Sequence, residues 1–326
     1  MQNSDSGELS LSPVESRCAV WAACPALVAT AKEASLHAMV TFLDIVIAGL
    51  LLGGLYSLIA MGLSLQYGVA RVANFSHGEF IMLGGMITWT LYTVFGVNPL
   101  VCLAVAGPLT FILGFIIHRT VFKRLFVSST SPAVFESNSV LASFALLFLI
   151  QNIASIGWGT QIRQYSYLRV PVDFGGVVFG ANRLVTLGFA IAIGLAFYVF
   201  VTRTRMGKAI RASAQDAATA GLMGVNIDMV LGLCFALGAA LAGMAGMLIS
   251  MSYPVHVVMG QEYTVIAMIV VVLGGLGSIP GSFIGGFLLG LVGSVVTYFD
   301  PGLALVAYYF IFVLLLLVKP TGLMGR

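Results

Sequence analysis

The chain has 326 residues, of which 60% are hydrophobic and only 8% are charged, and its mean hydropathy is +1.05. An ordinary soluble domain carries about 25% charged residues, so these side chains do not suffice to cover a water-exposed globule of 34.4 kDa. The composition therefore indicates a polytopic membrane protein, and the net charge of +3, spread over scattered basic residues, does not indicate a nucleic-acid partner.

Residues 1–40 differ from the rest of the chain. Acidic residues outnumber basic ones there, and the single apolar stretch, 19–31, is too short to span a bilayer. A secretory signal would begin with basic residues, whereas this segment begins MQNSDSGELS. We expect a disordered extension that precedes a membrane domain at 41–326, and Met39 is a candidate natural start.

From Thr41 onward, the hydropathy pattern predicts an all-α membrane domain with eight to ten spans, of which nine is the preferred number. The predicted windows are 42–66, 73–95, 98–117, 137–157, 183–202, 229–250, 263–280, 282–299 and 303–318. As one helix, the stretch 263–299 would run ~55 Å against a ~30 Å hydrocarbon core. The glycines and the proline between 274 and 281 are therefore expected to break it.

Lys and Arg in short loops predict the orientation, because such residues favour the cytoplasmic side. Three groups are expected there: Arg119, Lys123 and Arg124; Arg203, Arg205, Lys208 and Arg211; and Lys319 with Arg326. This pattern places the N-terminus outside. The loop 158–182 also contains arginines, but it is long and rich in Tyr and Val, so we interpret it as a small external cap.

Glycines recur inside the predicted spans, for example as GxxxG pairs at Gly49/Gly53, Gly281/Gly285 and Gly286/Gly290. Small residues at this spacing let helix backbones approach one another in lipid. We expect tight helix packing, and a helix surface that slides during transport is the alternative that spacing does not exclude.

The loop 203–228 predicts a docking helix that begins after Ser213 and ends at Gly224. Helical spacing places Ala214, Ala217, Ala218, Gly221 and Leu222 on one face, and Gln215, Asp216 and Thr219 on the other. A face of alanine and glycine buries too little apolar area to hold the helix on its own bundle, but it fits a groove on a partner. The alternative is a solvated loop whose arginines only fix the topology.

The segment ANFSHGEF, 73–80, is expected at the cytoplasmic end of the second window. Ser76 and Glu79 have the spacing of a capping box. The rival interpretation makes Asn74, His77 and Glu79 part of a transport route or gate, since ionisable groups inside a membrane domain usually face a cavity or a partner. A metal site would need further donors, which the sequence does not offer at suitable spacing.

Gln151, Asn152 and Glu262 are further polar candidates for the substrate route, although amides at membrane depth also bond helices together. The sequence contains no GxxxxGK[ST], GxSxG or HExxH pattern. We therefore expect no catalytic residue, metal or cofactor in this chain, and any energy from ATP would come from another subunit.

Three blocks of the sequence resemble LivH-type permease subunits of branched-chain amino acid ABC importers, and the likeness extends over essentially all of 41–326. The blocks are GLLLGGLYSLIAMGLSLQYGVARVANFSHGEFIMLGG (49–85), KAIRASAQDAATAGLMGVNID (208–228) and VVLGGLGSIPGSFIGGFLLG (271–290). The resemblance implies an ABC importer permease fold in which 214–224 is the coupling helix that contacts the ATPase subunit. The implied coupling residues are Arg211, Ala214, Gln215, Asp216, Ala217, Gly221, Leu222 and Gly224.

The resemblance also implies the partners: a second, LivM-like permease, two ATPase subunits that use ATP and Mg, and a periplasmic substrate-binding protein, all at the bacterial inner membrane. The implied substrates are branched-chain amino acids, or a related amino acid, urea, an amide or an aromatic acid, moved by alternating access. A secondary transporter or channel working alone is the alternative, and Glu79 would be its best ion-coupling carboxylate. An intramembrane enzyme would need a nucleophile and base at matching depth, which the sequence lacks.

Overall fold

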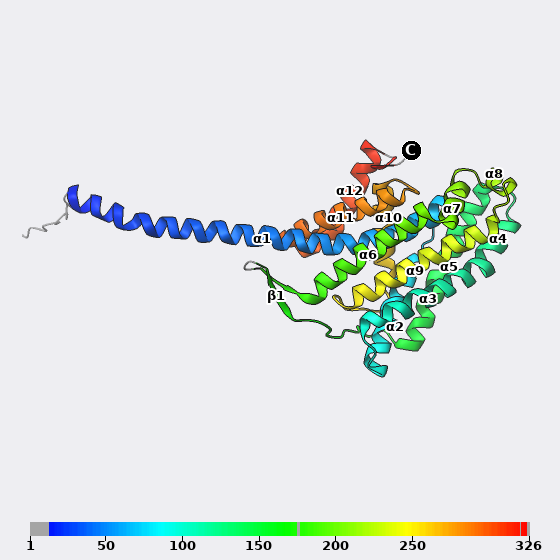
Figure 1. Cartoon of the computed structure of the whole chain (residues 1–326), viewed down its shortest axis with the longest axis horizontal. Helices are drawn as coiled ribbons and strands as arrows, with labels where there is room; N and C mark the ends of the chain where they lie inside the picture. The colour runs from blue at the N-terminus through cyan, green and yellow to red at the C-terminus, as the bar shows by residue number, and fades with distance from the viewer. Residues whose placement is uncertain (1–12, 175–176, 320, 325–326) are drawn as a thin grey trace, which may run out of the picture. The chain divides into compact units, whose positions relative to one another are not determined.

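The computed structural model describes residues 13–174, 177–319 and 321–324, with side chains described from residue 37 onward apart from 173–178. The chain divides into two units, residues 1–44 and 45–326. Almost all of the described backbone is helical (Figure 1), which confirms the predicted all-α membrane fold. The helices are α1 (Pro13–Ala70), α2 (His77–Phe95), α3 (Pro99–Ile117), α4 (Lys123–Ser128), α5 (Pro132–Trp158), α6 (Ala181–Arg203), α7 (Arg205–Gln215), α8 (Ala217–Leu222), α9 (Ile227–Ser250), α10 (Met259–Gly274), α11 (Ile279–Phe299) and α12 (Ala304–Val318). A π-helix, η1 (His118–Phe122), joins α3 to α4, and a 3-10 turn, η2 (Pro301–Leu303), precedes α12.

The disorder predicted for residues 1–40 stays a prediction. Residues 1–12 lie outside the described residues, but the backbone is helical from Pro13 as the first part of α1. The stretch 19–31 is rich in alanine, which has the highest intrinsic helix propensity of all residues.

Seven of the described helices are long and apolar enough to cross a membrane. They correspond to seven of the nine predicted windows, and the other two windows, 73–95 and 263–280, contain α2 and α10. Helix α10 has 16 residues, about 24 Å at 1.5 Å per residue, which is less than the ~30 Å hydrocarbon core. The number of nine full spans therefore stays a prediction.

Helix α9 forms the core of the second unit. Its most apolar window is 83% buried, against 44% or less for the other six spans. Small residues permit this burial: a Cβ added to Gly84 of α2 would collide with the carbonyl group of Gly243 on α9. In the same way, Gly53 of the first GxxxG pair meets the backbone at Gly290 of α11. The predicted tight packing through glycine is confirmed.

The predicted break inside 263–299 is also confirmed. Helix α10 ends at Gly274 and α11 begins at Ile279. Between them, Gly275 and Gly277 have φ angles of 101° and 80°, a region that residues with a Cβ rarely adopt. The two helices therefore reverse direction over a four-residue turn, 275–278.

Helices α2 and α10 both begin inside the bundle. After α1 ends at Ala70, residues 71–76 return toward the interior, and the His77 ring nitrogen Nε2 lies 3.1 Å from the carbonyl oxygen of Ile59. Ile59 precedes the end of α1 by 70 − 59 = 11 residues, or about 16 Å of helix. The predicted position of 73–80 at a cytoplasmic helix end is therefore wrong, because a hydropathy window does not register a chain that turns back.

The loop 158–182 carries a small hairpin, which the all-α expectation did not include. Strand β1 (Pro171–Phe174) pairs antiparallel with β2 (Val177–Gly180). The loop is fixed to the end of α9, because the Tyr165 hydroxyl lies 2.9 Å from Ser250 Oγ and Asn182 Nδ2 donates to the Met251 carbonyl at 3.0 Å. Figure 1 shows the hairpin and α8 at opposite ends of the second unit, as expected for a cap on the external side.

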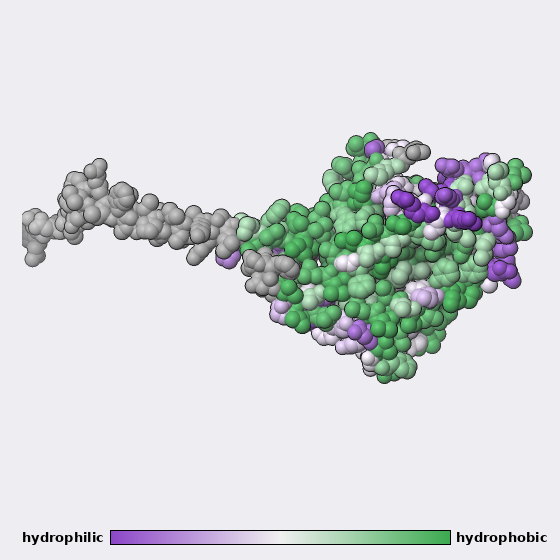
Figure 2. Space-filling model, viewed as in Figure 1, coloured by the Kyte–Doolittle hydropathy of each residue, from purple (hydrophilic) through white to green (hydrophobic). Residues whose placement is uncertain are grey.

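The other end of the second unit carries α4, α7 and α8. Lys123 Nζ and Asp228 Oδ2 form an ion pair at 2.6 Å, which ties α4 to the start of α9. In Figure 2 the hydrophilic surface gathers most densely at this end, whereas apolar surface covers the flanks of the spans. The basic groups at 119–124 and 203–211, which were predicted to share one side of the membrane, thus lie at one end of the bundle, while Arg326 lies outside the described residues.

Candidate functional sites

The loop 203–228 forms two helices that meet at Asp216. The backbone of Asp216 is extended (φ −152°, ψ 103°), and one carboxylate oxygen accepts hydrogen bonds from the N–H groups of Ala218 at 2.9 Å and Thr219 at 3.1 Å. The Thr219 hydroxyl donates to the other carboxylate oxygen. Asp is a preferred N-cap because it satisfies N–H groups that have no partner within the helix. The prediction of a single docking helix over 214–224 is therefore wrong, because the chain turns at Asp216, the N-cap of α8.

Asp216 lies in solvent outside the spans, and hydrogen bonds stabilise the ionised form of its carboxyl group. Hydrogen bonds from the Thr219 side chain, then from the N–H groups of Thr219 and Ala218, hold the pKa of its carboxyl below the usual range. The cap is therefore ionised at neutral pH. At the other end of α8, Gly224 has a φ of +88°, so the predicted end of the helix at this glycine is confirmed.

One face of α8 is fully exposed. We define the α8 tip as the exposed residues Ala217, Ala218, Gly221, Leu222 and Met223. Leu222 is 89% exposed and Met223 is 82% exposed, while Ala220 is buried and attaches the helix to the bundle. Sequence reasoning predicted four of these five residues and missed Met223, although the pair Leu-Met between two glycines was the signal for it.

The remaining predicted coupling residues lie on α7. Arg211, Ala214 and Gln215 line a groove of about 720 Å³ together with residues from the end of α1, the 275–278 turn and the C-terminal segment. The partners in this groove are Tyr67, Gly68, Arg71, Leu276, Gly277, Ser278, Thr321 and Met324. The structure thus divides the predicted coupling residues into two groups. Three lie on α7, and the other five lie on α8 or at its ends: Asp216, Ala217, Gly221, Leu222 and Gly224.

A second site lies where α2 and α10 begin. We call it the α2–α10 junction and define it by Asn74, His77, Glu79, Gly260 and Thr264. Its returning segment is held by Asn74, whose Oδ1 accepts hydrogen bonds from Ser76 N at 3.1 Å and Ser76 Oγ at 2.7 Å. Ser76 therefore bonds to Asn74 rather than to the helix, and the predicted capping box is not formed.

The start of α10 is bonded to the start of α2. The N–H of Gly78 donates to the Thr264 hydroxyl at 2.8 Å, and a Cβ on Gly260 would lie 2.7 Å from Glu79 Oε1. Both helix N-termini carry positive dipole ends. They meet inside the bundle, around the carboxyl group of Glu79.

Glu79 itself is fully buried, and neither of its carboxyl oxygens has a hydrogen-bond partner among the described residues. His77 is also fully buried, and within the same part of the chain its Nδ1 has no partner. Buried polar groups are nearly always paired, so packing among the described residues does not account for this carboxyl at the meeting point of two helix N-termini.

The other predicted polar residues lie elsewhere. Gln151 and Asn152 are on α5, where exposed Asn152 donates to the Phe148 carbonyl of its own helix at 2.7 Å. Glu262 is exposed on the first turn of α10. The structure therefore brings Asn74, His77 and Glu79 together and leaves Gln151 and Asn152 on α5, whereas Glu262 belongs to the same turn of α10 as Gly260 and is exposed.

An apolar helical bundle with two helices that start at mid-depth and an exposed loop helix at its basic end defines a multi-pass membrane protein. Residues 45–319 match the family described as the permease component of branched-chain amino acid transport systems. The chain belongs to this family of transport permeases.

Three relatives illustrate the likeness. The high-affinity branched-chain amino acid transport system permease protein LivH of Salmonella typhimurium is 31% identical over 306 residues, covering 87% of this chain and 96% of LivH. Its counterpart BraD of Pseudomonas aeruginosa is 30% identical with the same coverage. The probable branched-chain amino acid transport permease protein LivM of Methanocaldococcus jannaschii is 24% identical, covering 74% of this chain and 79% of LivM.

Among solved structures, PsaBC from Streptococcus pneumoniae in complex with Fab has a TM-score of 0.48 and 13% identity, and covers 86% of this chain and 92% of its own. This likeness is too weak to support an inference.

Proposed function

We propose that the chain is a permease subunit of an ABC importer that moves branched-chain amino acids, or a related small amino acid or amide, across the bacterial inner membrane. The observation that carries the coupling part of the proposal is the exposed α8 tip at the basic end of the bundle. The names of the relatives, LivH and BraD, support the substrate class. Separate ATPase subunits supply the energy, and access to the route alternates between the two sides of the membrane.

The α8 tip has the properties of a docking surface. Burying a leucine or methionine side chain stabilises an interface by about 1.5–3 kcal/mol, and Leu222 and Met223 are both almost fully exposed. The small side chains at Ala217, Ala218 and Gly221 let a partner approach the helix backbone closely. A partner with an apolar cleft on the cytoplasmic side, which we infer to be the ATPase subunit, fits this surface.

Helix α7 connects the tip to the bundle. A Cβ on Gly207 would collide with the carbonyl group of Val201 at the end of α6, and Ile210 is fully buried. The N-terminal half of α7 is therefore packed without space against α6. A force applied to α8 would move α7 and α6 together, which is the rigid-body coupling that alternating access requires.

The α2–α10 junction is our candidate for the gate on the substrate route. Transporters commonly build their substrate sites from helices interrupted near the bilayer midplane, whose N-termini point at the bound solute. Here two such N-termini meet at Glu79, which lacks a partner among the described residues. We infer that Asn74 and His77 shape the gate and that the Glu79 carboxyl changes partners as it opens.

The assembly that this function requires contains a second, LivM-like permease, two ATPase subunits that bind ATP and Mg, and a periplasmic substrate-binding protein. The similarity of the chain to a LivM protein as well as to LivH proteins supports pairing of two related permeases. This chain would supply half of the route and one coupling surface.

Replacing Gly221 by tryptophan tests the coupling. A Cβ at Gly221 meets no atom closer than 3.7 Å, so the variant folds, but the bulky ring covers the α8 tip. We expect labelled leucine uptake by cells, and ATPase activity that co-purifies with the chain, to fall at least tenfold. The amount of chain in the membrane stays the same.

Gly157→Trp is the matched control. Gly157 lies exposed on α5 with no atom within 4 Å of an added Cβ, and this change leaves uptake and co-purifying ATPase activity intact. Normal uptake in the Gly221→Trp variant would refute the assignment of α8 as the coupling element.

The rival function, a secondary transporter working alone, finds support in the buried, unpaired carboxyl of Glu79. Reconstitution distinguishes the two functions. The purified chain in vesicles with an imposed proton gradient should not accumulate leucine. The same chain with its co-purifying permease and ATPase subunits, with ATP and Mg inside the vesicles and the substrate-binding protein outside, should accumulate it. Gradient-driven uptake by the chain alone would replace the ABC proposal.

A further inference from the structure

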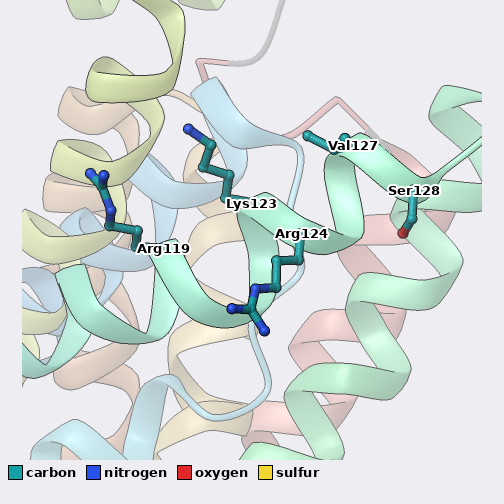
Figure 3. A pocket seen from close by; sticks show the side chains of 5 residues that line it. All are labelled: Arg119, Lys123, Arg124, Val127 and Ser128. Carbon is teal, nitrogen blue, oxygen red and sulfur yellow. The ribbon is translucent and has the colours of Figure 1, made fainter.

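The junction of α3, η1 and α4 carries a basic groove that neither the coupling site nor the gate uses. We define the basic groove as the open depression of about 400 Å³ lined by Arg119, Lys123, Arg124, Val127 and Ser128. In Figure 3, Arg119 and Lys123 extend to one side of the helix and Arg124 extends to the other. Cationic side chains therefore extend from both sides of this helix.

The positive charge of this groove is only partly neutralised. Lys123 is paired with Asp228 at 2.6 Å, which is the single ion pair among the described residues. Arg119 and Arg124 are exposed and have no acidic partner in that part of the chain. Two guanidinium groups thus remain available, and guanidinium binds phosphate oxygens in a bidentate manner.

A wholly apolar groove lies directly before the basic one along α3. It has a volume of about 300 Å³ and is lined by Leu83 and Ile87 of α2 and by Leu109, Thr110, Ile112, Leu113 and Ile116 of α3. Leu109, Ile112 and Ile116 are 46%, 54% and 50% exposed, as expected for side chains that face lipid. Its one polar lining residue, Thr110, bonds to its own helix, so the groove suits a hydrocarbon chain rather than a polar ligand.

Helical spacing places the two grooves one after the other along α3, η1 and α4. The exposed positions 109, 112 and 116 follow helical spacing, and Arg119 comes three residues after Ile116, about 4.5 Å further along the axis. Arg119, Lys123 and Val127 then continue at the same spacing through η1 and α4. The apolar stripe that faces lipid therefore ends in cations at the end of the bundle where the basic loops gather.

We propose that the two grooves together bind one anionic phospholipid of the cytoplasmic leaflet. Its phosphate lies in the basic groove that Arg119 and Arg124 line, and one acyl chain lies in the apolar groove between α2 and α3. A cytosolic protein could contact the cationic side chains but could not reach the apolar groove inside the bilayer. A phospholipid has a phosphate for the cations and an acyl chain for the apolar groove. Basic pockets beside transmembrane helices on the cytoplasmic side are suited to anionic head groups.

The experiment measures lipid selectivity in the intact assembly. The full chain, with the subunits that co-purify with it, is placed in nanodiscs of phosphatidylcholine that contain spin-labelled phosphatidylglycerol or spin-labelled phosphatidylcholine. The immobilised fraction of each probe gives the preference for phosphatidylglycerol. In the double variant Arg119→Gln and Arg124→Gln we expect this preference to fall about fivefold or more, without loss of folded protein, because both side chains are exposed.

Two further variants make the result specific. Arg203→Gln with Arg205→Gln removes the same charge from exposed positions at the same end. These residues line neither of the two grooves, so this variant should keep most of the preference. Ile112→Trp fills the apolar groove from a half-exposed position and should reduce immobilisation of phosphatidylglycerol while Arg119 and Arg124 are unchanged.

An unchanged preference in the Arg119/Arg124 variant, or an equal loss in the Arg203/Arg205 variant, would overturn the proposal. Loss of a subunit from the Arg119/Arg124 variant with unchanged lipid selectivity would assign the groove to a protein partner instead. Soluble glycerol phosphate lacks acyl chains, so it should not displace the labelled lipid. Displacement by millimolar glycerol phosphate would mean that a free phosphate suffices.

Discussion

At the scale of single residues, Glu79 and Asp216 show how one type of side chain serves opposite purposes. Asp216 stands in solvent and satisfies the first N–H groups of α8. Glu79 is fully buried, and its oxygens find no partner among the described residues. Leaving a buried polar group unpaired costs about 1–3 kcal/mol. A residue that lowers stability in this way is the natural place to separate function from folding.

Glu79→Met tests this separation, because methionine has nearly the same length and shape but no polar atoms. We expect the unfolding midpoint of the purified chain to stay the same or to rise, because the free energy of unfolding gains up to about 1–3 kcal/mol. Leucine uptake should fall at least tenfold. Thermal unfolding in detergent followed by tryptophan fluorescence, and uptake in cells, give the two readouts.

Asn74→Leu is the control for that experiment. It removes hydrogen bonds to Ser76 and to Gln66, so it should lower the unfolding midpoint. If Glu79→Met lowered the midpoint as much as Asn74→Leu does, the carboxyl would be a structural group and its place in the gate would be lost.

At the scale of helices, the sequence predicts breaks well where backbone chemistry requires a particular residue. Gly275 and Gly277 mark the turn before α11, and Gly224 marks the end of α8. It predicts less where tertiary contacts decide. Nothing local requires 71–76 to return into the bundle, because Gln66, which accepts a hydrogen bond from Asn74, is itself fixed by a hydrogen bond to the Phe235 carbonyl on α9. The division at Asp216 was visible as an N-cap signal, but the apolar face of 214–222 suggested one continuous helix.

Gly84→Ala tests the packing of α2 on α9. The added methyl group collides with the backbone of Gly243, which does not move as a side chain would, so we expect a loss of about 1–3 kcal/mol in stability. Gly188→Ala on α6 is the matched control, since an added Cβ there meets nothing within 4 Å. Better helix propensity should make this control neutral or more stable by up to about 1 kcal/mol. Thermal unfolding of both variants decides, and equal midpoints would contradict close contact between α2 and α9.

At the scale of the molecule, the arrangement of charge was predictable from the sequence, but the depth in the bundle at which α2 and α10 begin was not. The composition indicates a membrane protein, and the basic loops gather at the end that carries α4, α7 and α8 (Figure 2). The meeting of α2 and α10 inside the bundle joins residues 77–79 to residues 260–264, a pairing that hydropathy windows do not contain. One end therefore carries the proposed coupling surface, and the proposed gate lies between that end and the hairpin.

This arrangement predicts which side of the membrane reaches each end. In a chain with Cys18 and Cys24 replaced by serine, Cys102 and Cys234 remain but are buried, so single cysteines introduced on the surface report alone. Met223→Cys at the α8 tip should react with a membrane-impermeant maleimide only in inside-out vesicles, and Ser166→Cys in the exposed loop 158–182 only in spheroplasts. The expectation follows from the basic loops, which favour the cytoplasmic side, and from the position of the hairpin and α8 at opposite ends (Figure 1). Labelling of Met223→Cys from outside would show that the protein has the opposite orientation. In that orientation α8 could not contact an ATPase in the cytosol.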